Sequence, residues 1–154
     1  MPRVLVLNGP NLQRLGSPEP DHYGAAALAG VEAALVAAAL GNAAPAGVEV
    51  DLRQTDDEAT LVGWLHDAAD AGTPVILNPA AFAHYSYALA EAVRVVTASA
   101  VPLVEVHLTN PAAREAFRAE SVVAPVATGA ITGLGVDGYL LALAWLGKRL
   151  QPAG

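Results

Sequence analysis

Residues 3–12 read Arg3-Val4-Leu5-Val6-Leu7-Asn8-Gly9-Pro10-Asn11-Leu12, an apolar run that passes directly into a polar turn. The apolar run predicts a strand, and the glycine and proline that follow it predict a turn. Further turn-rich sequence continues to residue 24, so this loop is longer than a connection between two elements requires. Because loops of this kind usually carry function, we expect a functional site at the carboxyl end of the first strand.

Short apolar runs recur along the chain with helical stretches between them. Strands are predicted at 3–7, 48–52, 75–77 and 103–106, with a short fifth strand near 122–126. Helices are predicted at 25–40, 55–72, 86–98, 114–118 and 137–150. This order predicts an α/β fold, a flavodoxin-like doubly wound sheet of about five parallel strands with helices on both faces. A chain of 154 residues is most simply a single domain, here residues 1–154.

Two helix starts carry local signals. Thr55-x-x-Glu58 has the form of a capping box at the start of the second helix. Asn110-Pro111 predicts a helix cap with proline at the first helical position. Both signals place polar groups directly after a strand.

Composition excludes several functional classes. The formal net charge is −7 with only 8 lysines and arginines, which argues against a nucleic-acid or anionic-membrane surface. The sequence has no cysteine, which excludes disulfides and thiol chemistry. No stretch has the pattern of a secretion signal or a membrane span, so we expect a cytoplasmic protein.

Polar loops follow three of the predicted strands, at 8–23, 78–84 and 107–110. In a doubly wound sheet ligands bind beyond the carboxyl ends of the strands, so these loops should meet at one edge. The G-x-G-x-x-G pattern at 133–138 is better explained as a tight entry into the last helix, because the second strand and acidic residue of a dinucleotide site do not follow it.

No metal and no cofactor are expected. His22, His66, His84 and His107 lack the spacing of metal ligands, and we interpret His66 as structural.

Several motifs occur together in a fixed order along the chain. They are N-G-P-N-L-x-x-L-G-x-x-E-P-x-x-Y-G at 8–24, Arg53-Gln54-Thr55-x-x-Glu58 with Trp64-Leu65-His66, N-P-A-A-F-A-H-Y-S at 78–86, E-V-H-L-T-N at 105–110, R-E-x-F-R at 114–118 and G-L-G-x-x-G-Y at 133–139. Together they resemble the type II dehydroquinases, the 3-dehydroquinate dehydratases of the shikimate pathway of aromatic amino acid biosynthesis.

The resemblance implies an anti elimination of water from a cyclic β-hydroxyketone carboxylate through an enolate, without a cofactor. By position it implies that Tyr23 is the base, that His107 is the acid held by Glu105, and that Asn11 orients the water that stabilises the enolate. The residues are also open to simpler readings, Tyr23 as a packed loop tyrosine and His107 as a strand-end histidine satisfied by Glu105.

The remaining implied residues would bind the substrate. They are Asn78, His84, Arg118 and the backbone N–H groups of Leu108 and Thr109, with Glu91 supplied by a neighbouring subunit. N–H groups before a capped helix would also suit a carboxylate without any family argument. The resemblance implies a homo-oligomer, in that family a dodecamer built of trimers.

The chain departs from the family pattern at Pro18, where the family has an arginine before the Glu-Pro pair. Ionising a tyrosine near neutral pH requires about 4 kcal/mol of extra stabilisation of the phenolate, which a nearby cation would supply. Arg14 and Arg114 are the candidates to replace that cation.

Other departures are Ala112, Thr109, Glu91 and Tyr85, whose ring could reshape the pocket beside His84. Two alternatives therefore stay open beside the dehydratase: a diverged family member acting on a different substrate in specialised metabolism, and a non-catalytic homologue that binds a ligand.

Overall fold

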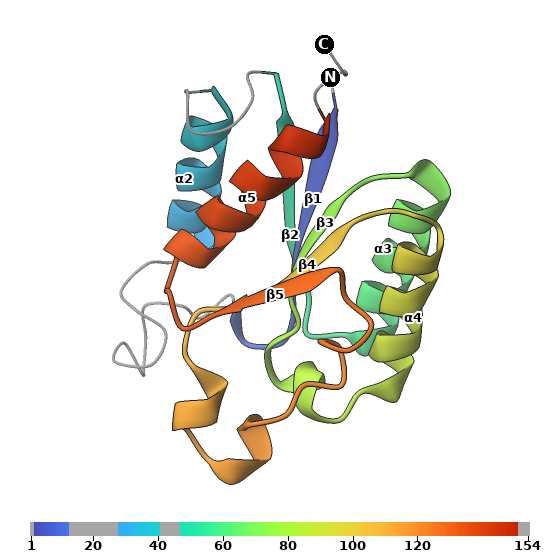
Figure 1. The fold of residues 1–154 in the computed structure, drawn as a ribbon, viewed down its shortest axis with the longest axis vertical. Coiled ribbons are helices and arrows are strands. Elements are labelled where there is room, and N and C mark those ends of the chain that lie inside the picture. Colours follow the sequence, from blue (N-terminus) through green and yellow to red (C-terminus); the bar gives the residue numbers. More distant parts are fainter. Residues whose placement is uncertain (1, 13–27, 41–46, 151–154) are drawn as a thin grey trace.

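The computed structural model describes residues 2–12, 28–40 and 47–150. A parallel sheet lies at the centre of the molecule (Figure 1). Its strands are β1 (Arg3–Asn8), β2 (Glu49–Gln54), β3 (Val75–Asn78), β4 (Leu103–His107) and β5 (Gly129–Thr132). The order across the sheet is β2-β1-β3-β4-β5, with all four neighbouring pairs parallel. This is the flavodoxin-like order, so the predicted fold class is confirmed.

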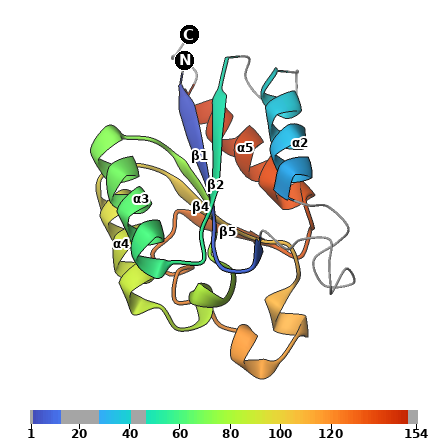
Figure 2. The same cartoon turned by 180° about the vertical axis from the view of Figure 1, so that it is seen from behind.

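Helices cover both faces of the sheet (Figures 1 and 2). Helices α2 (Leu28–Leu40) and α5 (Asp137–Leu150) pack on one face, and α3 (Glu58–Ala71) and α4 (Tyr87–Ala98) on the other. Successive side chains of β1 alternate between the two cores, Val4 and Val6 on the α2/α5 side and Leu5 and Leu7 on the α3/α4 side. No helix in the described ranges is long and apolar enough to cross a bilayer.

Most predicted elements agree with the structure to within a few residues. The helix predicted at 86–98 is α4, capped by Ser86, whose Oγ accepts a hydrogen bond from the N–H of Leu89 at 3.0 Å. The helix predicted at 137–150 is α5. The turn before it is formed by Gly133 and Gly135, both at positive φ, which supports the interpretation of that motif as a helix entry. Residues 25–27, the start of the first predicted helix, lie outside the described residues.

The strand predicted at Val122 to Val126 is wrong. Residues 122–126 form turns, and β5 (Gly129–Thr132) is the strand that pairs with β4. The backbone N–H groups of Val123 and Ala124 both donate to the Oγ of Ser121 at 3.1 Å, so they are not available to a neighbouring strand. Val123 is nevertheless fully buried in the α3/α4 core, which explains its apolar character.

The capping box predicted at Thr55 and Glu58 is also wrong. Asp57 caps α3, because its carboxylate accepts the N–H of Thr60 at 3.0 Å. The Oγ1 of Thr55 instead accepts the N–H of Asp57 at 3.0 Å, one step before the helix. A negatively charged carboxylate at the N-cap also interacts favourably with the positive end of the helix dipole.

The helix predicted at 114–118 is absent, and two 3₁₀ turns take its place, η3 (Pro111–Ala113) and η4 (Ala116–Arg118). The cap at Asn110 is confirmed, since its Oδ1 accepts the N–H of Ala112 at 3.2 Å. Arg114 then has an extended backbone with ψ −156°, which ends the first turn after three residues.

The ends of β1 and β3 approach each other closely at Gly9. Its N–H donates to the carbonyl of Asn78 at 2.8 Å. A Cβ at this position would lie 2.5 Å from the carbonyl oxygen of Pro79 and 2.9 Å from its carbonyl carbon. Glycine is therefore required where these two loops leave the sheet.

We expect Gly9→Ala to lower the free energy of unfolding by about 1–3 kcal/mol, because the added methyl group forces backbone apart. Urea unfolding followed by circular dichroism measures this change. Gly63→Ala is the matched control, since a Cβ there meets nothing within 4 Å and α3 gains a better helix former. Equal stability of the two variants would contradict the close approach.

Candidate active site

The carboxyl ends of the strands bring polar side chains to one edge of the sheet. Asn8 on β1 lies in register with Gln54 on β2 and with Asn78 on β3, and His107 lies in register with Thr132. The loops that follow these strands leave from the same edge (Figure 1). This is the edge at which doubly wound folds bind ligands.

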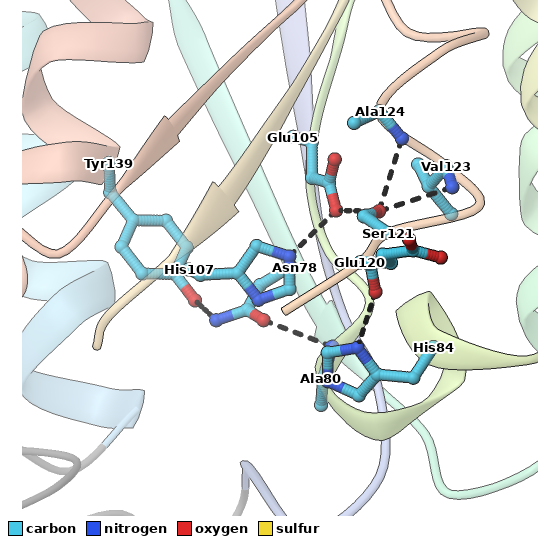
Figure 3. Close-up of polar contacts among 10 residues, drawn as sticks. All are labelled: Asn78, Ala80, His84, Glu105, His107, Glu120, Ser121, Val123, Ala124 and Tyr139. Carbon is cyan, nitrogen blue, oxygen red and sulfur yellow. Dashed lines mark hydrogen bonds and ion pairs between the residues drawn. The ribbon is translucent and has the colours of Figure 1, made fainter. Parts of the chain in front are cut away.

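Glu105 and His107 form a buried pair at the end of β4 (Figure 3). Residues two apart on a strand point to the same face, and the His107 Nε2 lies 2.7 Å from the Glu105 Oε2. Glu105 is 1% exposed and His107 8% exposed. A carboxylate buried this deeply needs a partner, and the imidazole N–H provides one.

A second donor reaches the same carboxylate oxygen. The Oγ of Ser121 lies 2.7 Å from the Glu105 Oε2, on the segment between η4 and β5 (Figure 3). Among the described residues none bonds to the Nδ1 of His107, so this nitrogen is open to a ligand at the sheet edge. A histidine held at one nitrogen by a carboxylate can accept and release a proton at the other.

His84 lies beside His107. Its ring is stacked on that of His107, with centroids 6.5 Å apart and planes at 23°. The Nδ1 of His84 lies 2.8 Å from the carbonyl oxygen of Glu120, so that nitrogen carries the hydrogen and the Nε2 is left as an acceptor in the neutral ring. Two imidazoles with defined proton positions therefore stand at the same edge (Figure 3).

A buried network holds Asn78 in place. The Asn78 Nδ2 donates to the hydroxyl of Tyr139 at 2.9 Å, and that hydroxyl donates to the Oδ1 of Asn8 at 2.6 Å. The Asn78 Oδ1 accepts the N–H of Ala80 at 3.1 Å, which fixes the orientation of the amide. All three side chains of this network are buried.

Burial raises the pKa of the Tyr139 phenol well above its usual range, opposed only in part by the hydrogen bond from Asn78. The hydroxyl therefore stays protonated at neutral pH and keeps donating to Asn8. Tyr139 is therefore a neutral hydrogen-bond donor that orients side chains of the site, and it does not act as a base.

The Leu108 and Thr109 residues follow β4 directly. None of the described residues accepts a hydrogen bond from either backbone N–H, so both groups are open to a ligand oxygen. The segment after them is a single 3₁₀ turn. It lacks the dipole of a full α-helix, so no helix dipole helps these N–H groups to bind an anion.

The arginines near the site are already engaged with an acidic side chain. The Nε of Arg118 bonds to the Oε2 of Glu115 at 2.5 Å, and its guanidinium lies 4.8 Å from the centre of the Phe117 ring. Arg114 is mostly buried, with its Nε 4.0 Å from the same carboxylate oxygen. The pKa of the Glu115 carboxyl lies below its usual range, because the carboxylate accepts a hydrogen bond from the backbone N–H of Glu115 and another from the Arg118 guanidinium.

Three other predicted residues are exposed to solvent. Asn11 is exposed with φ +66°, and its N–H donates to the Oδ1 of Asp56 at 2.9 Å. Glu91 is exposed on α4. The Tyr85 ring is 59% exposed and packs edge-on against Phe82, and its effect on the pocket beside His84 stays a prediction.

Tyr23, Arg14 and Pro18 lie outside the described residues. The structure therefore leaves their roles as predictions. His66, interpreted as structural, is exposed on α3 and contributes nothing to the core.

The sequence analysis missed Asn8, Tyr139 and Ser121. Asn8 and Tyr139 belong to motifs that were quoted, yet their contact spans 131 positions and no local pattern reports it. Ser121 precedes an apolar stretch that was assigned to a strand, which hid the turn that Ser121 caps.

Fold and side chains together define a flavodoxin-like α/β protein with a histidine–carboxylate pair at the carboxyl edge of its sheet. A family model described as Dehydroquinase class II matches residues 2–147. The chain therefore belongs to the type II dehydroquinase family.

Individual relatives agree. The 3-dehydroquinate dehydratase of Kineococcus radiotolerans is 54% identical over 148 residues, which are 96% of this chain and 97% of that protein. The 3-dehydroquinate dehydratase of Bacillus licheniformis is 48% identical over 145 residues, 94% of this chain and 95% of that protein. The crystal structure of the type II dehydroquinase from Propionibacterium acnes superposes with a TM-score of 0.88 at 47% identity, covering 96% of this chain and 97% of that one.

We expect Tyr139→Phe to lower the free energy of unfolding by about 1–3 kcal/mol, because the Asn8 Oδ1 and the Asn78 Nδ2 lose their hydrogen bonds to the hydroxyl in a buried site. Chemical denaturation measures the loss. Tyr87→Phe removes the same atom from an exposed ring and should change stability by less than about 0.5 kcal/mol. If both variants were equally stable, the buried hydrogen-bond network would not contribute to the stability of the fold.

Proposed function

We propose that this chain is a 3-dehydroquinate dehydratase, a hydro-lyase that converts 3-dehydroquinate to 3-dehydroshikimate by anti elimination of water through an enolate. The observation that carries the proposal is the buried Glu105–His107 pair beside His84, at the ligand edge of a chain of this family. The 3-dehydroquinate dehydratases at 54% identity give the substrate. The reaction belongs to the shikimate pathway.

The reaction requires a base on one face of the substrate, an acid on the other, and stabilisation of the enolate oxygen between them. His107 is the acid: the Nδ1 delivers a proton to the departing hydroxyl, and Glu105 stabilises the imidazolium before that step. Tyr23 is the base, and Asn11 orients the water that contacts the enolate. The last two roles rest on sequence position.

Substrate binding is assigned to groups around the acid. The open N–H groups of Leu108 and Thr109 suit the ring carboxylate, and Asn78 and His84 present polar atoms to the ring hydroxyls. Arg118 would add a positive charge after exchanging its contact with Glu115. Glu91 of a neighbouring subunit completes the set by family position.

Proline at position 18 in place of the family's loop arginine, inferred from the motif order, requires another cation near Tyr23. Arg114 is the candidate among the described residues, because its guanidinium side chain is mostly buried and lies between η3 and η4, on the segment that follows β4. Arg14 is the second candidate.

Removing the cation that replaces the family arginine should lower kcat by at least about tenfold, because one charge near 4 Å contributes up to about 4 kcal/mol. Arg114→Ala and Arg14→Ala are compared in a steady-state assay. Lys148→Ala, which removes an exposed cation from the far end of α5, is the control. If neither arginine variant loses activity, the phenolate has another source of stabilisation.

The activity itself is tested by mixing the purified protein with 3-dehydroquinate and following the ultraviolet absorbance of the conjugated enone. His107→Asn should lower kcat by about 10²–10⁴-fold, the usual contribution of general acid catalysis. His66→Asn changes an exposed imidazole remote from the site and should leave the rate unchanged. Absence of enone with the unsubstituted protein would favour the non-catalytic alternative, and turnover of another ring acid alone would favour the diverged one.

Three further features are inferred with this function. The chain is one dehydroquinase-like domain over residues 1–154, it acts in the cytoplasm, and it assembles as a homo-oligomer, in this family a dodecamer built of trimers. The family match over residues 2–147 supports the first.

A further inference from the structure

The segment between η4 and β5 contacts His84 directly and His107 only through Glu105 (Figure 3). The carbonyl of Glu120 accepts from the His84 Nδ1, and the adjacent Ser121 bonds through its Oγ to the carboxylate that holds His107. The N–H of Val122 donates to the carbonyl of Ala83 at 2.7 Å, which fixes this segment against η2 independently of either side chain. One short stretch of chain thus holds the His84 imidazole and the carboxylate that bonds to His107.

The hydrogen bonds around the Ser121 hydroxyl allow its proton to be donated to one acceptor only. A hydroxyl has one hydrogen to donate and two lone pairs to accept with. The N–H groups of Val123 and Ala124 can only donate, and both point at the Oγ at 3.1 Å. Both lone pairs are therefore occupied, and the hydroxyl proton is directed to the Glu105 Oε2 at 2.7 Å.

That oxygen consequently cannot carry a proton directed at Ser121. It accepts the Ser121 proton on one side and faces the imidazole on the other, so the Glu105 carboxylate acts as the acceptor in both contacts. The proton between Glu105 and His107 then stays on the His107 Nε2. The imidazole must use its Nδ1 for any exchange with a ligand.

Ser121 is one of the two hydrogen-bond donors that reach this carboxylate from the described residues. The Glu105 Oε1 is buried and accepts no hydrogen bond from the described residues, so Ser121 and His107 both bond to the Oε2. Without Ser121, the buried charge of Glu105 would depend on His107 alone, and its carboxyl group would be free to turn.

We infer that Ser121 is a positioning residue for the proposed reaction: by donating to Glu105 it keeps the proton of His107 on Nε2 and leaves Nδ1 facing the substrate. This inference rests on the proposed role of His107 as the acid. Ser121 itself touches no reacting atom, so its loss should change kcat more than KM.

The test compares Ser121→Ala with Ser121→Thr. The alanine variant should lower kcat by about 10–100-fold, the range that one hydrogen bond to a charged group corresponds to, with KM changed by less than about twofold. The threonine variant keeps the hydroxyl and should recover most of the rate. A kcat for Ser121→Ala equal to that of the unsubstituted protein would overturn the inference.

Thr128→Val is the matched control. The Oγ1 of Thr128 accepts the N–H of Leu103 at 2.9 Å, so this variant also removes a hydroxyl that holds backbone, at the opposite end of the same strand β4. It should lose stability without losing kcat. A fall in kcat as large as that of Ser121→Ala would show that any loosening of β4 is sufficient, which contradicts a specific role.

Nitrogen-15 NMR of the histidine side chains provides a readout independent of turnover. In the unsubstituted protein the His107 signals should report a hydrogen on Nε2 and the His84 signals a hydrogen on Nδ1. Ser121→Ala should alter the His107 signals and leave those of His84, because the Val122 contact still holds the segment. Unaltered His107 signals, or equal changes at both histidines, would overturn the inference.

If Ser121→Ala does not fold, Ser121→Cys replaces it, and its weaker S–H donor should lower kcat and shift the His107 signals, whereas a cysteine variant equal to the unsubstituted protein would overturn the inference. If the unsubstituted protein does not turn over 3-dehydroquinate, the proposed function fails, while the NMR comparison still decides whether Ser121 sets the proton position of His107.

Discussion

The hydrogen bond between Glu105 and His107 is the contact on which the rest of the site depends. A carboxylate this deeply buried is costly unless donors reach it, and the inner strand β4 places His107 two residues away on the same face. The pair in turn fixes which imidazole nitrogen is available at the sheet edge. A histidine free to rotate at the same position would have neither a defined proton nor a counter-charge for its imidazolium form.

The fold supplies the frame for this pair from parts that are far apart in the sequence. The Asn8–Tyr139–Asn78 network ties the ends of β1 and β3 to the first turns of α5, and Gly9 lets the two loops leave the sheet in contact. Close packing of Gly138 on Val106 brings the same helix against β4. The position of the acid is thus set by the meeting of three strands and one helix.

The sequence predicts much of this, and its failures have physical causes. Strands and helices with strong apolar patterns, such as β1 and α5, were predicted within one or two residues. β5 was missed because Gly129–Thr132 is an edge strand with little apolar character, while the apolar residues before it are buried through turns. His107 and Glu105 could be proposed from their motif. Ser121 and Tyr139 could not, because their importance comes from partners that only the tertiary fold brings near.

The most direct test is a crystal structure of the protein with a cyclohexene carboxylate related to the proposed product. We expect a ring oxygen within about 3 Å of the His107 Nδ1 and the ligand carboxylate at the N–H groups of Leu108 and Thr109. A ring bound elsewhere, or a His107 ring that has turned its Nδ1 to Glu105, would contradict it.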